Sequence, residues 1–128
     1  LRYVIGHDCG NVINPKLVDG QVLGGFAHGI GNALYEQPYY DEAGQPQTTS
    51  YLDYALPSSV EVPPVELVHL YTPSPLNPLG VKGAGEGGTI PVPATIANAV
   101  EDALRPFGAR ITDLPLTPAK IFAALGTG

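Results

Sequence analysis

The chain of 128 residues carries a formal net charge of −6, only 6 basic residues (Lys and Arg) and 44% hydrophobic residues. This length corresponds to one domain at most, the hydrophobic content excludes a disordered chain, and so few basic residues argue against a nucleic-acid-binding groove. The 16 glycines and 14 prolines are about twice the ordinary share and predict long, shaped loops.

The first predicted element is a strand over residues 2–6, which are rich in β-branched and aromatic side chains. Asn14 and Pro15 then mark a turn. Cys9 lies between them and is either a nucleophile or, as we expect, a small buried thiol at the end of the strand. As the single cysteine, it excludes an internal disulfide and a cysteine-held iron–sulfur cluster within this chain.

A helix is predicted from a cap at Asp19 or Gly20 to about Glu36, because apolar residues recur at helical spacing. These apolar residues are Val22, Leu23, Phe26, Ala27, Ile30, Ala33 and Leu34. Several glycines lie in or beside this helix, and each interior glycine costs about 1 kcal/mol relative to alanine. Either close packing against another backbone or a large ligand at the helix start would offset this cost. Gln21 falls in the first turn, where free N–H groups favour an anion.

The middle of the chain predicts short strands. Residues 37–40 and 47–54 are expected to form a hairpin around a turn at residues 41–44. Residues 65–71 alternate apolar and polar side chains and predict a further short strand.

Residues 78–89 form a glycine-rich segment with a single carboxylate, Glu86, which has no side chain beside it. Such a segment is either a turn with a solvated glutamate or a loop that holds the carboxylate against a ligand as a general base. Gly83, Gly85 and Gly88 also fit a dinucleotide-binding pattern, but prolines surround the segment where that pattern requires a strand and a helix, so we reject it.

The C-terminal part predicts two more helices. Pro93 opens the first at an allowed first-turn position, and Thr117 begins the last. The expected buried stripe of the first comprises Ile96, Ala97, Val100, Ala103 and Leu104. Residues 110–112 predict a short strand between them. The fold class expected is therefore α+β, with about three helices packed on short, mostly antiparallel strands.

Three motifs occur in order along the chain: Asp8-Cys9-Gly10 with Ile13-Asn14-Pro15, Gly20-Gln21-Val22-Leu23-Gly24-Gly25 with Gly29-Ile30-Gly31, and Lys82-Gly83-Ala84-Gly85-Glu86. Together they resemble the C-terminal end of the molybdenum-binding large subunit of the xanthine dehydrogenase / aldehyde oxidase / aerobic carbon monoxide dehydrogenase family. The similarity extends from Tyr3 to about Thr117, and residues 74–88 look most like carbon monoxide dehydrogenase large chains.

The resemblance implies roles for individual residues. Glu86 corresponds to the catalytic glutamate of the family, which acts as a general base. The implied cofactor-binding residues are Gly20, Gln21, Lys82, Gly83, Ala84 and Gly85. The family holds the metal through the pterin, so no protein ligand to the metal is expected, and the three histidines (His7, His28 and His69) share no metal-site spacing. His28 stands where many relatives carry glutamine, and its role is left open.

The implied reaction is oxidative hydroxylation of a carbon centre (aldehyde, N-heterocycle, purine or carbon monoxide) with water as the oxygen source. The implied cofactor is molybdenum-molybdopterin, expected in the cytosine dinucleotide form, with iron–sulfur clusters and FAD on partner subunits or domains. The expected partners are the remainder of the large subunit, the iron–sulfur and FAD subunits and a small-molecule substrate, and no nucleic acid. The alternative is a structural or interaction fragment with no cofactor binding or activity of its own.

The chain begins at Leu1 and contains no methionine, so we expect it to be a piece of a longer protein. Residues 1–128 would then be the C-terminal segment of the molybdenum-cofactor-binding domain, inactive as an isolated chain. No apolar run approaches 18 residues and no signal peptide is visible, so we expect no transmembrane segment and a cytoplasmic location.

Overall fold

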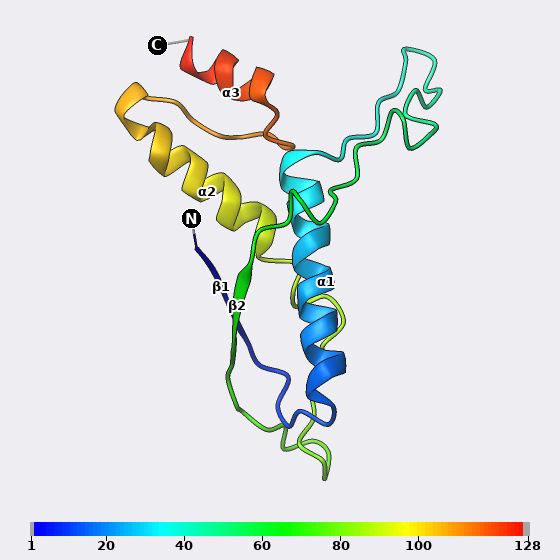
Figure 1. Ribbon diagram of the computed structural model, residues 1–128, viewed down its shortest axis with the longest axis vertical. Coiled ribbons are helices and arrows are strands. Elements are labelled where there is room, and N and C mark those ends of the chain that lie inside the picture. The colour runs from blue at the N-terminus through cyan, green and yellow to red at the C-terminus, as the bar shows by residue number, and fades with distance from the viewer. Residues whose placement is uncertain (1, 127–128) are drawn as a thin grey trace.

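A two-stranded parallel sheet lies against one long helix (Figure 1). The computed structural model describes residues 2–126. Strand β1 (Tyr3–His7) pairs with β2 (Val65–His69) in parallel, and helix α1 (Pro15–Leu34) lies between them in the chain. Parallel neighbours need a crossover connection, which here includes α1. The α+β class and the three helices are confirmed, whereas the mostly antiparallel pairing that the sequence predicted is wrong for these two strands.

Helix α1 begins earlier than the sequence predicted. Asn14 is its N-cap and accepts a hydrogen bond on its side-chain oxygen from the Leu17 backbone N–H (3.3 Å), and Pro15 occupies the first turn. The Asn-Pro pair is therefore a helix start, because proline fits the first helical position and asparagine caps it. The helix ends where the Tyr35 N–H donates to the Gly31 carbonyl (2.9 Å).

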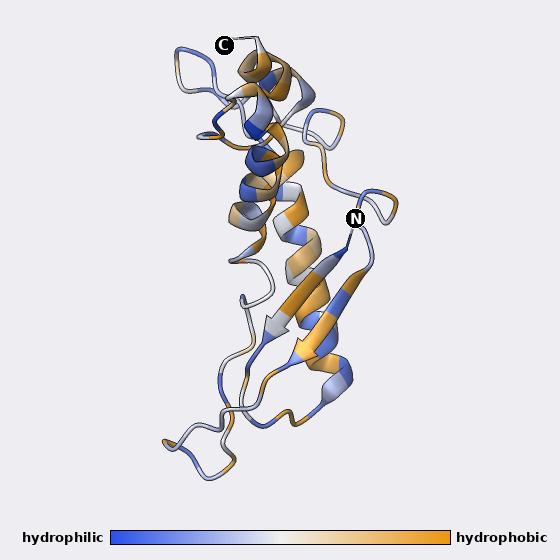
Figure 2. Ribbon diagram, turned by 90° about the vertical axis from the view of Figure 1, so that its left-hand side faces the viewer, coloured by the Kyte–Doolittle hydropathy of each residue, from blue (hydrophilic) through white to orange (hydrophobic). Residues whose placement is uncertain are grey.

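The hydrophobic core lies between the sheet, α1 and the start of α2 (Val92–Leu104). Its buried members are Ile5, Val22, Phe26, Ile30 and Val92. The rings of Tyr3 and Phe26 lie 4.7 Å apart between their centroids and are tilted by 51°, a contact that joins the first strand to α1. Figure 2 shows both strands running the same way in front of α1, with hydrophobic residues along all three elements. Most of the stripe predicted for α1 is thus confirmed, although Leu23 is exposed.

Residues 36–64 form an irregular arm that projects away from the end of α1 (Figure 1). The predicted hairpin does not form there, since the arm contains only one antiparallel bridge, between Tyr40 and Pro46. Tyr39 and Tyr51 on the arm are 52% and 84% exposed instead of packed in a sheet. A two-stranded hairpin needs a third strand or a helix to pack against, and within residues 2–126 none covers this one.

The C-terminal helices cover less surface than expected. Along α2, only Val92 is buried, and Ala103 of the predicted stripe is exposed. The 3-10 turn η1 (Arg105–Phe107) ends α2, and α3 (Pro118–Leu125) begins at its predicted Thr117 cap. The predicted strand at residues 110–112 does not form. Among the helices within residues 2–126, none has the length and apolarity required to span a bilayer.

Candidate active site

The glycine-rich segment lies directly against α1. Gln21 lies in the second turn of α1 and not, as the sequence predicted, in the first. It donates a hydrogen bond from Nε2 to the Gly85 carbonyl oxygen at 2.7 Å. Further along, a Cβ on Gly88 would lie 2.3 Å from the Val22 carbonyl oxygen, and a Cβ on Gly25 would lie 2.9 Å from the Gly88 carbonyl carbon. The two backbones therefore touch at positions where neither tolerates a side chain.

Four of the five glycines of α1 fall into two groups. Gly25 and Gly29 are buried, and a Cβ on Gly29 would lie 2.4 Å from the Val92 Cβ, so these two allow close packing. Gly20 and Gly24 are exposed, and a Cβ on either would meet nothing within 4 Å. Close packing therefore explains the first pair. The second pair leaves a bare, open face beside Gln21, where the ligand explanation still applies as a prediction.

Glu86 is presented outward by a tight turn. Its backbone carbonyl accepts hydrogen bonds from the Thr89 N–H (2.9 Å) and the Ile90 N–H (3.2 Å), which leads the chain towards α2. Its side chain is exposed and makes no hydrogen bond or ion pair with any residue in the 2–126 range. Gly83 and Gly85 before it have open space where a Cβ would be. The carboxylate is therefore available to a ligand.

Lys82 is held by Asp8 at the end of β1. The Lys82 Nζ lies 2.9 Å from Asp8 Oδ1, which also accepts from the Gly10 N–H (2.9 Å) and the Thr72 N–H (3.2 Å). The hydrogen bond to Thr72 is the largest cause that holds the pKa of the Asp8 carboxyl far below its usual range, and the hydrogen bond to Lys82 is the second largest. The sequence identified the Asp8-containing motif but gave this carboxylate no role. Its contacts show that it joins three segments beneath the glycine-rich loop.

Residues 8–11 and 80–82 run side by side. The Lys82 N–H donates to the Cys9 carbonyl (2.8 Å), and the Asn11 N–H donates to the Gly80 carbonyl (3.0 Å). Gly10 has a φ of +68°, and a Cβ there would lie 2.2 Å from the Gly80 carbonyl oxygen, so only glycine fits. Cys9 is buried, as the structural interpretation of this residue predicted.

A shallow pocket of about 280 Å³ opens beside this junction, with Lys82, Ala84 and Leu17 in its lining.

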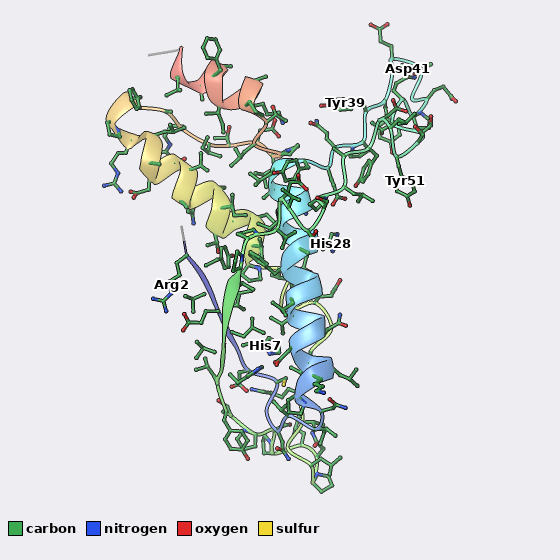
Figure 3. All side chains as sticks on the ribbon, viewed as in Figure 1. Arg2, His7, His28, Tyr39, Asp41 and Tyr51 are labelled. Atoms are coloured by element: carbon green, nitrogen blue, oxygen red, sulfur yellow. The ribbon has the colours of Figure 1, made fainter. Side chains whose placement is uncertain are left out.

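His28 is exposed on α1, one turn beyond Gly24 (Figure 3). His69 places Nε2 2.7 Å from the Asp19 Oδ1. The part of the chain that the structure describes contains no group of three or more His, Cys, Asp or Glu side chains arranged to hold a metal ion.

The open surface fits a bulky, polar ligand. Gly20 and Gly24 on α1, and Gly83 and Gly85 on the loop, expose backbone over which nothing is packed. Gln21 and Glu86 place two polar side chains beside these glycines: an amide that donates and accepts, and a free carboxylate.

Comparison with known proteins points in the same direction. Residues 1–63 match the family model described as the molybdopterin cofactor-binding domain. The chain is 51% identical over 117 residues to the nicotine 6-hydroxylase large subunit of Paenarthrobacter nicotinovorans and 37% identical over 127 residues to the carbon monoxide dehydrogenase large chain of Hydrogenophaga pseudoflava. The crystal structure of quinoline 2-oxidoreductase from Pseudomonas putida 86 superposes with a TM-score of 0.93 at 44% identity.

These matches cover nearly all of this chain but a small part of each relative. The two sequence relatives match over 91% and 97% of this chain, which spans only 14% and 15% of their length. For the quinoline enzyme the shares are 97% of this chain and 16% of the other.

Proposed function

Since this chain belongs to the molybdenum-binding large-subunit family of xanthine dehydrogenase, aldehyde oxidase and carbon monoxide dehydrogenase, we propose that it supplies the catalytic base of a molybdenum hydroxylase. The observation that carries the proposal is Glu86: an exposed carboxylate with no partner in the described chain, beside a bare backbone surface. A general base must be free to approach the group it deprotonates, and this one is.

When bound, the molybdenum cofactor supplies the two-electron acceptor for hydroxylation with water as the oxygen source. Gly20, Gln21, Lys82, Gly83, Ala84 and Gly85 are the residues proposed to hold it. The Gln21 amide donates one hydrogen bond to the Gly85 carbonyl, and its side-chain oxygen accepts a hydrogen bond from a donor on the cofactor. A carboxylate oxygen of Glu86 accepts the proton that the water-derived nucleophile loses as it attacks the substrate carbon. Lys82, paired with Asp8, acts mainly by fixing the start of the loop.

The substrate class we favour is a pyridine-type N-heteroaromatic ring, as opposed to a purine. The relatives named for nicotine and quinoline are 51% and 44% identical to this chain, whereas the carbon monoxide dehydrogenase large chain is 37% identical. Aldehydes, purines and carbon monoxide are the competing substrates. Their pocket would be shaped largely by parts of the subunit outside these residues.

Further properties follow as proposals from the family. The cofactor takes the cytosine dinucleotide form, and iron–sulfur clusters and FAD on partner subunits remove the electrons. The remainder of the large subunit completes the site, so the isolated chain is inactive. The location is cytoplasmic.

The experiment that tests the proposal measures molybdenum and pterin in this chain alone and in the complete complex. We expect about one of each per assembled complex and almost none in the isolated chain. The loaded complex is then mixed anaerobically with nicotine, quinoline, benzaldehyde, xanthine or carbon monoxide, and bleaching of its iron–sulfur and flavin absorbance is followed. Bleaching by nicotine or quinoline, and by none of the other three compounds, supports the substrate class.

The second candidate is a structural segment without a cofactor role. Its support is the large number of exposed apolar side chains, among them Leu52 at 97% and Leu76 at 91% exposure, which need covering by other segments. A well-folded complex that contains neither molybdenum nor pterin would establish this candidate and end the first.

A further inference from the structure

One buried polar side chain has no place in the site described above. His7, the last residue of β1, is 8% exposed, and it is the only polar or charged residue counted among the buried residues of the described chain. It lies two residues after core residue Ile5, so its side chain is on the sheet face that packs against α1 (Figure 3). Its Nδ1 is enclosed and has no hydrogen-bond partner within residues 2–126.

The imidazole ring of His7 touches the glycine-rich loop. A Cβ on Gly87 would lie 2.7 Å from the His7 Nε2 and 2.9 Å from its Cδ2, distances shorter than real Cβ contacts. Gly87 does not have a positive φ, so its conformation would accept alanine, and the ring alone forbids it. The ring edge and the Gly87 backbone are therefore in direct van der Waals contact.

This contact lies next to Glu86 and completes a set of supports around it. The Gly85 carbonyl before Glu86 is held by the Gln21 amide, and Gly88 beyond it rests on the Val22 carbonyl. Between these two contacts, His7 is the side chain that touches residue 87. The Glu86 side chain itself has no support, so its position depends on the backbone on either side.

We propose that His7 is a positioning residue for Glu86. Its ring supports the turn at Gly87 by direct contact, and this contact sets how far the carboxylate projects towards the cofactor. The proposal rests on the proposed function of Glu86. A general base displaced by about 1 Å can lose about 100-fold in rate, so the position of the His7 ring against Gly87 matters for turnover.

The test is a suppressor experiment in the complete complex. Gly87→Ala places a methyl group against the ring, His7→Ala removes the ring, and the double variant restores room. Gly6→Ala is the matched control, because its Cβ would meet only the Leu70 Cδ1 at 3.8 Å. Gly88→Ala is the second control, since its obstacle is the Val22 backbone, which His7→Ala cannot move.

Two measurements are made on each variant. Hydrogen–deuterium exchange of amides 83–90 reports the loop without any substrate. Steady-state kinetics, with the N-heteroaromatic compound that the parent complex turns over, separate kcat from KM, while molybdenum content and thermal midpoint are recorded.

We expect Gly87→Ala to speed exchange across the loop and to lower kcat about 100-fold, with KM and molybdenum content unchanged. The double variant should regain at least about tenfold of that loss, while Gly88→Ala should not be rescued and Gly6→Ala should match the parent. Parent-like exchange and kcat in Gly87→Ala, or a double variant no better than Gly87→Ala, would overturn the proposal. If the parent complex contains neither molybdenum nor pterin, the proposed function fails, and the exchange data still decide whether His7 supports the loop.

Discussion

Replacing Glu86 with glutamine tests the base assignment with the least structural disturbance. The two side chains have the same shape, and the carboxylate makes no hydrogen bond or ion pair in the described chain that the change would break. We therefore expect the stability to change by no more than about 0.5 kcal/mol. A positioned general base contributes about 10²–10⁴ in rate, which corresponds to about 2.7–5.4 kcal/mol of activation free energy.

The assay compares kcat and molybdenum content of the complete complex carrying Glu86→Gln with those of the parent. We expect kcat to fall by at least about 100-fold while molybdenum stays bound. Glu86→Asp keeps the carboxylate but withdraws it by about 1.5 Å, one carbon–carbon bond, so its loss should be about 100-fold as well. Glu42→Gln, on the exposed arm, is the matched control and should leave kcat unchanged.

Two results would refute this reasoning. An unchanged kcat in Glu86→Gln would remove the base role. A parallel loss of molybdenum and activity would show instead that the carboxylate binds the cofactor, and the free carboxylate seen here would then be a cofactor ligand.

Three further predictions concern the surroundings of Glu86. Gln21→Glu replaces the amide donor to the Gly85 carbonyl by an acceptor, so kcat should fall at least about fivefold. Gly29→Ala pushes against Val92, and overpacking of about 1–3 kcal/mol exceeds the helix-propensity gain of about 1 kcal/mol, so the thermal midpoint should fall. Because the pKa of Asp8 is lower in the folded protein, the ionised carboxylate stabilises the fold at every pH above its unfolded pKa of about 4. This contribution is lost as the pH falls from there towards the folded pKa. Asp8→Asn should therefore be less stable than the parent at pH 7, and the difference in stability should shrink only below about pH 4.

Each has a control or an outcome that would contradict it. Gly24→Ala makes the same change in the same helix with open space around it, and it should raise the thermal midpoint; a fall equal to that of Gly29→Ala would show that packing is not the cause. Gln21→Glu with parent-like kcat would mean that the 2.7 Å hydrogen bond is dispensable. A pH-independent difference between Asp8→Asn and the parent down to pH 3, measured by urea denaturation, would contradict the pKa argument.

The sequence predicted the helices because their signals are local. The spacing of Val22, Phe26 and Ile30 identified the buried stripe of α1, and the proline positions marked the starts of the later helices. The same spacing also separates two pairs of glycines in α1, since Gly25 and Gly29 fall on the stripe and Gly20 and Gly24 do not. Only the true start was missed, because Asn-Pro is compatible with both a turn and a cap.

The strands were harder to predict because pairing is not local. A strand, a helix and a strand in order favour a parallel pair, but the predicted hairpin between them obscured that pattern. The tyrosines at 39 and 51 have strand propensity, yet they lie on an arm for which residues 2–126 supply no neighbouring strand. In the site, Glu86 and Gln21 followed from a motif, whereas the contacts of Asp8 and His7 with the loop join segments more than seventy residues apart and needed the fold.

The two-stranded sheet has a practical consequence for anyone who produces this segment by itself. Within residues 2–126, β1 and β2 pair only with each other, so each strand keeps one side with unpaired backbone N–H and C=O groups. Val4 and Val68, 47% and 40% exposed, add apolar surface to the same ribbon. Open strand edges recruit other strands. The chain made alone is therefore expected to self-associate by edge-to-edge strand addition, and a partner segment that covers these edges would keep it monodisperse.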